Sequence, residues 1–481
     1  MLISNLYFYK NKAAILYLYG FLFALSITLI NPWGDSRGEI WTEPKLLIVQ
    51  GIIILNLLII LRHIRRYQLT ISLAWRVGCC LWASFLFIGL ISTLLSPFPL
   101  RSFWGQTEMG DGWFYWFFVA AFVLTNALVL QLKPNLVRPQ LYGFLAGGMV
   151  LAVAVLFQVY DWRIDFTATS GQINVFYSNY EILKSAIAKG EMPIGFYTNR
   201  GHAGFVLAAE GILTLLGLLW GWIYAPLAGI SYVLLCTCLF YTKCRGAILA
   251  LLVALTYLLI CFRFNSKKSI IIICYGVGLL LVSYLLFKTS ATWLTLQSAP
   301  EALPNPVEHD INFKNSTSLS IRFNLWKISL RGIIQRPLFG WGFDGFGIAH
   351  PFLIDWVGNH QRYLIDLVDV SKVLIIGDYS LEYLGIDGLV HAAYVINNKA
   401  HNLIMDIAIS VGISGLISYI SLFIFFLWCA VKAPLRGIEA VAITYLVYTL
   451  TWYESGQFSH LGWWGLSIGL GCTKLFKGKK E

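Results

Sequence analysis

His401 is the residue of this sequence whose type and position best fit chemistry. It opens the run His-Asn-Leu-Ile-Met-Asp, at the point where a long polar segment, 288–402, meets a long apolar segment. An imidazole gains and loses a proton near neutral pH, and an ionisable side chain at a membrane surface indicates a functional site. This position therefore favours proton transfer on a molecule that is carried by a lipid.

The composition indicates what surrounds this histidine. Of the 481 residues, 58% are hydrophobic and only 12% are charged. A soluble protein of this size needs more charge on its surface, so the sequence predicts a polytopic membrane protein. The net charge of +11 does not point to a nucleic-acid partner, because basic residues in short cytoplasmic loops account for it.

The cysteines and acidic residues do not form a metal-binding pattern. The nine cysteines lie almost entirely in apolar segments, and none belongs to a CxxC pair with nearby histidines. We expect them to pack as small hydrophobic residues, without a disulfide framework. The acidic residues expected outside the membrane show no clear ligand pair either, so we expect no metal and no cofactor.

Apolar segments of about 20 residues, the length that crosses the hydrocarbon core of a bilayer, recur along the chain. The first is followed by Asn31-Pro32 and lacks the cleavage site of a signal peptide, so we expect it to be retained. The segments that fit a membrane span are 13–30, 45–61, 77–95, 113–130, 141–160, 203–219, 223–240, 246–262, 270–287, 403–430, 437–453 and 461–475.

The loops between these segments indicate their orientation. With a cytoplasmic N-terminus, Lys and Arg far outnumber Asp and Glu in the cytoplasmic loops, as the positive-inside rule requires. Both termini are then cytoplasmic. The chain divides into spans 1–9 (residues 1–287, with an outer loop at 161–202), a large outer loop (288–402), and spans 10–12 with a basic cytoplasmic tail (403–481).

The short linker between the seventh and eighth predicted spans has an unusual charge. It carries Lys243 and Arg245 on the outer side, where short loops usually avoid basic residues. These cations indicate that an anion binds at the outer face.

The large outer loop contains one predicted helix. Four apolar residues, Ile321, Leu325, Ile328 and Ile333, recur at roughly helical spacing, and Pro337 ends the helix. Segment 351–400 mixes apolar and acidic residues and favours no particular fold.

Four short motifs occur in order along the chain. They are Gly195–Ala203 (GFYTNRGHA), Thr242–Ala247 (TKCRGA), Arg322 and Trp326 followed by Pro337–Gly342 (PLFGWG), and His401-Asn402 followed by Gly412 and Gly415. In order, spacing and placement among the spans, they resemble the O-antigen ligase and O-antigen polymerase family of bacterial inner-membrane glycosyltransferases.

The sequence departs from the family pattern at a few positions. The family usually has a second asparagine where Gly201 or His202 stands, and often glutamate where Ser410 stands. Segment 351–400 is also long for the family, which bears on the acceptor more than on the chemistry.

The resemblance implies an all-α, GT-C-like fold with about 12 transmembrane helices and a large, partly helical periplasmic loop between spans 9 and 10. It implies metal-independent, inverting transfer of a glycan from an undecaprenyl-pyrophosphate donor to an acceptor hydroxyl, in the biosynthesis of lipopolysaccharide or exopolysaccharide. His401 is then the general base. Arg245, Arg322 and Arg200 bind the pyrophosphate through their planar guanidinium groups.

Five further residues have supporting roles in this interpretation. Asn199 is expected to cap a helix, Asn402 to fix the local turn, and Asp406 to orient the imidazole or hold the site electrostatically. Trp326 is expected in the core of the loop or stacked on a sugar. His202 is the best alternative histidine.

Two other function classes compete with glycan transfer. A transporter, for inorganic carbon or a lipid-linked glycan, should show inverted repeats and polar residues at mid-membrane; Glu210 and Asp406 are the candidates, and both lie nearer the outer ends of their spans. A structural scaffold would leave the outward arginines without a role. The motifs leave open whether the enzyme is a ligase or a polymerase, and they do not identify the acceptor, the sugar or the oligomeric state.

Overall fold

The computed structural model describes residues 2–68, 70–159, 192–262, 267–297, 318–354, 370–394 and 399–472. Most of the predicted outer loop 161–202, parts of the large loop 288–402 and the basic tail from residue 473 lie outside the described residues.

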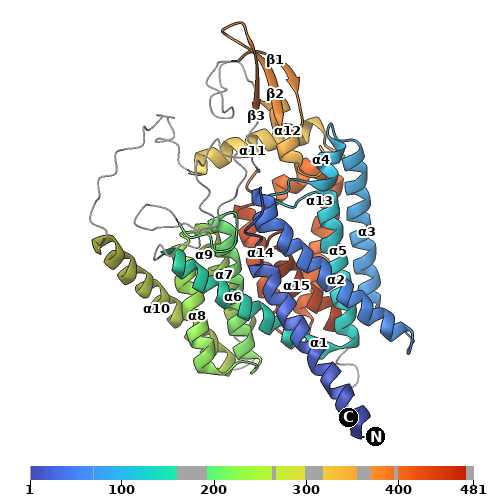
Figure 1. The fold of residues 1–481 in the computed structure, drawn as a ribbon, viewed down its shortest axis with the longest axis vertical. Coiled ribbons are helices and arrows are strands. Elements are labelled where there is room, and N and C mark those ends of the chain that lie inside the picture. Colours follow the sequence, from blue (N-terminus) through green and yellow to red (C-terminus); the bar gives the residue numbers. More distant parts are fainter. Residues whose placement is uncertain are drawn as a thin grey trace.

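The protein is an all-α polytopic membrane protein with one small sheet (Figure 1). Eight helices within the described residues are long and apolar enough to cross a membrane. Each of the twelve predicted spans falls on a helix of the bundle. These helices are α1 (Leu2–Thr28), α2 (Glu43–Ile64), α3 (Leu73–Leu94), α5 (Trp113–Leu132), α6 (Val137–Val159), α7 (Arg200–Leu219), α8 (Ala225–Tyr241), α9 (Arg245–Phe262), α10 (Lys267–Gln297), α13 (Leu403–Val431), α14 (Glu439–Thr451) and α15 (Ser459–Cys472).

The connections between helices alternate between two ends of the bundle. At one end, the Gln457 side chain donates to Thr198 and Thr42, which joins three separate loops. At the other end, Trp220 donates to the carbonyl of Arg436. The first end also carries the sheet, and we call it the sheet face (Figure 1).

Short helices cover the sheet face. They are the π-helix η1 (Gly38–Thr42), α4 (Pro99–Trp104), α11 (Ser318–Gln335) and α12 (Gly345–Leu353), whereas the 3-10 helix η2 (Pro134–Leu136) joins α5 to α6. The predicted apolar stripe of α11 is confirmed: Leu325 is buried, and Ile328 and Ile333 pack against the same cluster.

Segment 370–394, for which the sequence favoured no fold, forms a three-stranded antiparallel sheet in the order β1-β2-β3. The strands are β1 (Val370–Ile376), β2 (Ser380–Gly385) and β3 (Val390–Tyr394). Val370, Leu381 and Tyr383 form its small apolar core. Asp387-Gly388 lies in the turn between β2 and β3, and Gly388 has φ of 76°.

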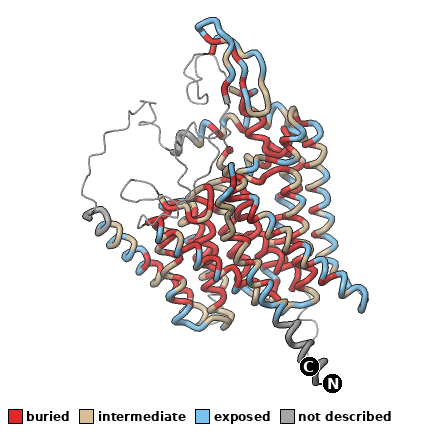
Figure 2. The backbone as a smooth tube through the Cα atoms, viewed as in Figure 1, coloured by how far each residue is buried: buried red, intermediate tan, exposed pale blue. Residues whose placement is uncertain are grey.

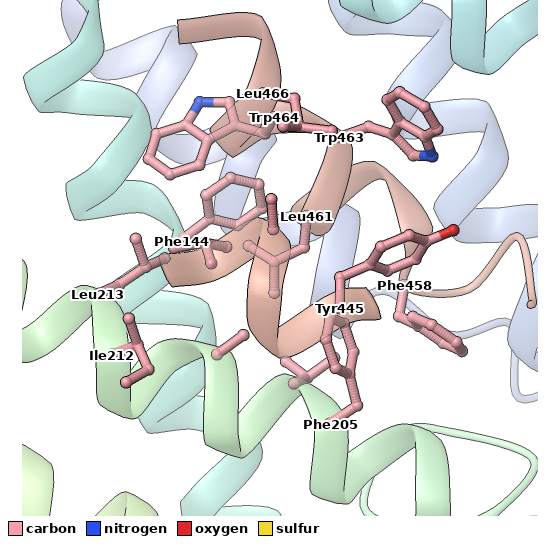
Figure 3. Packing of buried hydrophobic residues seen from close by; sticks show 14 of the residues in the cluster. Phe144, Phe205, Ile212, Leu213, Tyr445, Phe458, Leu461, Trp463, Trp464 and Leu466 are labelled. Atoms are coloured by element: carbon pink, nitrogen blue, oxygen red, sulfur yellow. The ribbon is translucent and has the colours of Figure 1, made fainter. Parts of the chain in front are cut away.

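The core of the bundle lies between its central helices (Figure 2). Every residue of α15 is buried. In this core Trp464 of α15 packs edge-on against Phe144 of α6, and Phe205 of α7 packs edge-on against Tyr445 of α14 (Figure 3). Phe205 also stacks on Tyr448 of α14. This apolar packing fixes α7, α14 and α15, which carry or border the site described below.

Helix α13 is broken at Gly412, which has φ of 70°. The turn after α11 fills the break: the carbonyl of Pro337 accepts from Ile413 N–H, and Trp341 N–H donates to the carbonyl of Ile409. A Cβ at residue 412 would lie 2.3 Å from the Leu338 oxygen. The absence of a side chain at Gly412 therefore allows the turn at 337–342, which is distant in sequence, to pack into the break in α13.

Candidate active site

His401 lies in the turn just before α13, and its backbone has the left-handed φ of 55°. Its Nδ1 lies 2.8 Å from the carbonyl oxygen of Lys399. A carbonyl only accepts, so Nδ1 must carry the proton and donate it, which leaves the lone pair of neutral imidazole on Nε2. Burial lowers the pKa of His401, and the charge of Arg322 lowers it further. At neutral pH the ring is therefore an unprotonated base.

The guanidinium of Arg322 and the imidazole of His401 both lie against Trp452. The ring of His401 packs edge-on against Trp452, with centroids 4.8 Å apart, and against Tyr453 at 5.1 Å. The guanidinium of Arg322 lies 5.7 Å from the centroid of the same Trp452 ring. Arg322 from α11 and His401 from the start of α13 are 79 residues apart in sequence and meet at the end of α14.

Arg200 and Arg245 are the first residues of α7 and α9, and both helices begin at the sheet face. The charges of Arg200 and Arg322 both act on the thiol of Cys244, which directly precedes Arg245. Helix N-termini carry partial positive charge and free N–H groups that favour anions. The starts of α7 and α9 are neighbours at the sheet face, since a Cβ at Gly204 would lie 3.0 Å from Cys244 Cβ.

None of these three arginines has an acidic partner among the described residues; Arg200 instead contacts the sulfur of Met192. Two buried donors nearby, the hydroxyl of Tyr448 and Nε1 of Trp452, also have no hydrogen-bond partner in the described part of the chain. Within the described residues, this region therefore combines arginines that have no acidic partner with hydrogen-bond donors that have no acceptor.

Two comparisons with known proteins bear on this geometry. Residues 230–364 match the family model of the O-antigen ligases. The match runs from α8 through α12 and includes Arg245 and Arg322, so it supports the resemblance to the O-antigen ligase family that the motifs indicated. Arg200 and His401 lie outside the matched residues. No curated protein matches the chain.

The supporting residues in the four motifs mainly form hydrogen bonds with the backbone. Asn199 caps α7 by accepting from Gly201 N–H at 2.7 Å. Asn402 caps α13 by accepting from Ile404 and Met405, and it also donates to the carbonyl of Leu450 on α14. A cap was expected at Asn199, whereas Asn402 was expected to fix the local turn and does so by capping α13.

Trp326 and Asp406 hold the residue before His401. Trp326 Nε1–H donates to the carbonyl of Ala400 at 3.0 Å, and Asp406 Oδ1 accepts from Ala400 N–H at 2.9 Å. Asp406 thus bonds the backbone and leaves orientation of the imidazole to the carbonyl of Lys399.

His202 is fully buried in α7, away from an open surface. Its ring packs against Tyr453 and Phe458, and Nδ1 lies 3.4 Å from the hydroxyl of Thr198. It is therefore enclosed by these aromatic rings and has the position of a structural residue.

A buried ionic cluster beside His401 was not foreseen from the sequence. The Lys399 ammonium forms ion pairs with Asp111 and Asp344, and Arg101 pairs with Asp344 at 2.7 Å. A cavity of about 30 Å³ lies among these groups, and Asp406 and Glu454 also line it; it has room for a water molecule. Burial raises the pKa of Glu454 to about 7. The one sequence signal was a lysine two residues before His401.

Proposed function

We propose that the protein transfers a glycan from an undecaprenyl-pyrophosphate donor to an acceptor hydroxyl at the sheet face, which we take as periplasmic. The observation that carries this proposal is the shared position of His401 and Arg322 on Trp452. One group accepts a proton and the other is a free cation, and the match of residues 230–364 to the O-antigen ligases supports the reaction class.

In the proposed step His401 acts on the acceptor. Nε2 takes the proton of the acceptor hydroxyl as its oxygen forms a bond to the anomeric carbon of the donor sugar. The bond between that carbon and the pyrophosphate oxygen breaks, and its electron pair leaves with the pyrophosphate. A single displacement of this kind inverts the configuration at the anomeric carbon.

The arginines act on the leaving group. Negative charge grows on the pyrophosphate as the bond breaks, and cations held in place before the reaction stabilise that charge most. Arg322 presents two parallel N–H donors to phosphate oxygens. Arg200 and Arg245 add their charges at the N-termini of α7 and α9.

The test uses purified protein in lipid nanodiscs with a polyprenyl-pyrophosphate glycan and a hydroxyl acceptor. His401→Ala should abolish transfer while the protein still inserts and accumulates. His391→Ala, on the sheet, is the matched control and should transfer as the wild type does. Normal transfer by the His401 variant would refute the proposal, and loss of wild-type transfer in EDTA would refute the metal-independent form.

A deletion strain separates the two kinds of enzyme in this class. A lipid core without attached chains identifies a ligase, whereas single attached repeat units identify a polymerase. An unchanged surface glycan contradicts both.

Transport remains the second candidate because of one buried acid. Glu210 lies within α7, and neither carboxylate oxygen has a hydrogen-bond partner among the described residues. A transporter needs such a group in its path. Glu210→Gln should then stop uptake of the cargo into vesicles, whereas glycan transfer predicts an enzyme that keeps its activity in this variant.

A further inference from the structure

Lys399 is a buried cation directly beside the catalytic turn. Its side chain extends to Asp111, before α5, and to Asp344, at the start of α12, with 2.6 Å between Nζ and Asp344 Oδ1. Its backbone carbonyl accepts the Nδ1 proton of His401. One residue therefore joins the ionic cluster to the imidazole.

The two carboxylates that hold Lys399 are themselves fixed. Asp344 pairs with Arg101 and accepts from the side chain of Gln106 at 2.9 Å. Asp111 accepts from the backbone N–H of Gln106. Burial alone would lower the pKa of Lys399, but the charges of Asp111 and Asp344 outweigh burial and raise it, so the ammonium stays charged.

Arg101 extends this cluster to the sheet. Its guanidinium contacts Asp378 and lies 4.1 Å from the ring centroid of Tyr379, and both residues belong to the turn between β1 and β2. The anchor for Lys399 thus includes α4, α12 and the sheet.

The His401 turn needs such an anchor because its backbone is strained. A residue other than glycine with φ near 55° persists only where its surroundings fix it. Asp406 and Trp326 hold the two backbone groups of Ala400. Lys399 supplies the remaining constraint, and its carbonyl selects the ring nitrogen that carries the proton.

We propose that Lys399 is a positioning residue: its ion pairs with Asp111 and Asp344 hold its carbonyl against His401, so that Nε2 stays free to accept a proton. The positioning is a property of the fold, whereas its effect on catalysis rests on the proposed function.

The experiment measures the histidine tautomer directly. The protein is labelled with ¹⁵N-histidine and placed in nanodiscs, and the His401 signal among the eight histidines is assigned with His401→Gln. Lys399→Met removes the ammonium. The double variant Asp111→Asn/Lys399→Met also removes one carboxylate, so no unpaired charge is left to unfold the protein. Lys372→Met, on an exposed part of β1, is the matched control.

In the wild type and in Lys372→Met, we expect His401 to carry its proton on Nδ1. In the double variant we expect an Nε2–H form or a mixture, with kcat lower by about 100-fold, the loss that a misplacement near 1 Å can cause, and an unchanged KM for the donor. Lys399→Met should show the same change or fail to accumulate.

A double variant that accumulates with the Nδ1–H form and near-wild-type kcat overturns the proposal. The two proposals fail separately. If His401→Gln still transfers glycan while the Lys399 variants change the tautomer, the positioning role stands and the proposed catalytic role of His401 is wrong.

Discussion

The sheet face holds two groups of cations that differ in their partners. Arg101 and Lys399 are buried and paired with the carboxylates of Asp111 and Asp344. Arg200, Arg245 and Arg322 are partly or fully exposed and have no acidic partner in the described part of the chain. The first group we call the paired cations and the second the free cations.

The difference shows what each group can do. A buried, paired cation is locked, because removal of either partner leaves an uncompensated charge in a low-dielectric interior. A free cation at a helix N-terminus keeps its field available for an anion that arrives later. We infer that the paired cations shape the site and that the free cations bind the substrate.

The largest effect should come from breaking the paired group. Asp344→Ala leaves Arg101 and Lys399 without their shared carboxylate, so the free energy of unfolding should fall by about 3–5 kcal/mol. Thermal unfolding in nanodiscs measures this loss. The matched variant Asp387→Ala removes an acid from an exposed turn of the sheet and should leave the unfolding temperature unchanged. Equal unfolding temperatures of the two variants would contradict the claim that the paired cations stabilise the fold.

Arg322→Ala tests the free group and should act on activity alone. Loss of one preorganised cation at the leaving group should lower kcat/KM by about 100-fold or more. The unfolding temperature should not change, because Arg322 has no ion pair within the described residues. Arg322→Lys should recover only part of the activity, since an ammonium lacks the planar pair of donors. An unfolding temperature that falls together with activity would place Arg322 among the paired cations.

The helical bundle could be predicted from the sequence because its signal is local. An apolar segment of about 20 residues marks a span wherever it occurs, and all twelve predicted segments lie on helices. The break in α13 could not be predicted, because the turn at 337–342 that fills it lies far from Gly412 in sequence. The sheet had a local signal that was passed over, the Asp387-Gly388 dipeptide typical of a hairpin turn.

The two groups of cations also differ in how far they could be predicted from the sequence. Arg200 and Arg245 directly precede apolar segments, and Arg322 and His401 stand in recognisable motifs, so their placement at one face could be predicted. The partners of Lys399 stand 55 and 288 residues away in sequence. Opposite charges so far apart in sequence form no recognisable motif, so their pairing is visible only in the structure.

The pH dependence of glycan transfer tests whether Arg322, one of the free cations, acts on His401. His401 acts as a base only when unprotonated, and burial together with Arg322 lowers its pKa below the ordinary 6.5. The rate should therefore rise with pH through a pKa below that value and stay level above neutrality. In Arg322→Gln this pKa should move upward, because the charge that disfavours the protonated ring is removed. A pKa that stays in place would show that Arg322 does not act on the imidazole.

The smallest effect should come from salt. Screening weakens interactions between exposed charges and leaves buried pairs nearly unaffected. Raising the ionic strength from about 0.1 M to about 0.5 M should therefore raise the KM for the donor, because the free cations are partly or fully exposed to solvent. The unfolding temperature, which depends on the paired cations, should hardly move. A KM that does not change with ionic strength would mean that the pyrophosphate does not bind to the exposed charges of Arg200, Arg245 and Arg322. The assignment of the free cations to substrate binding would then be wrong, even if each single variant loses activity.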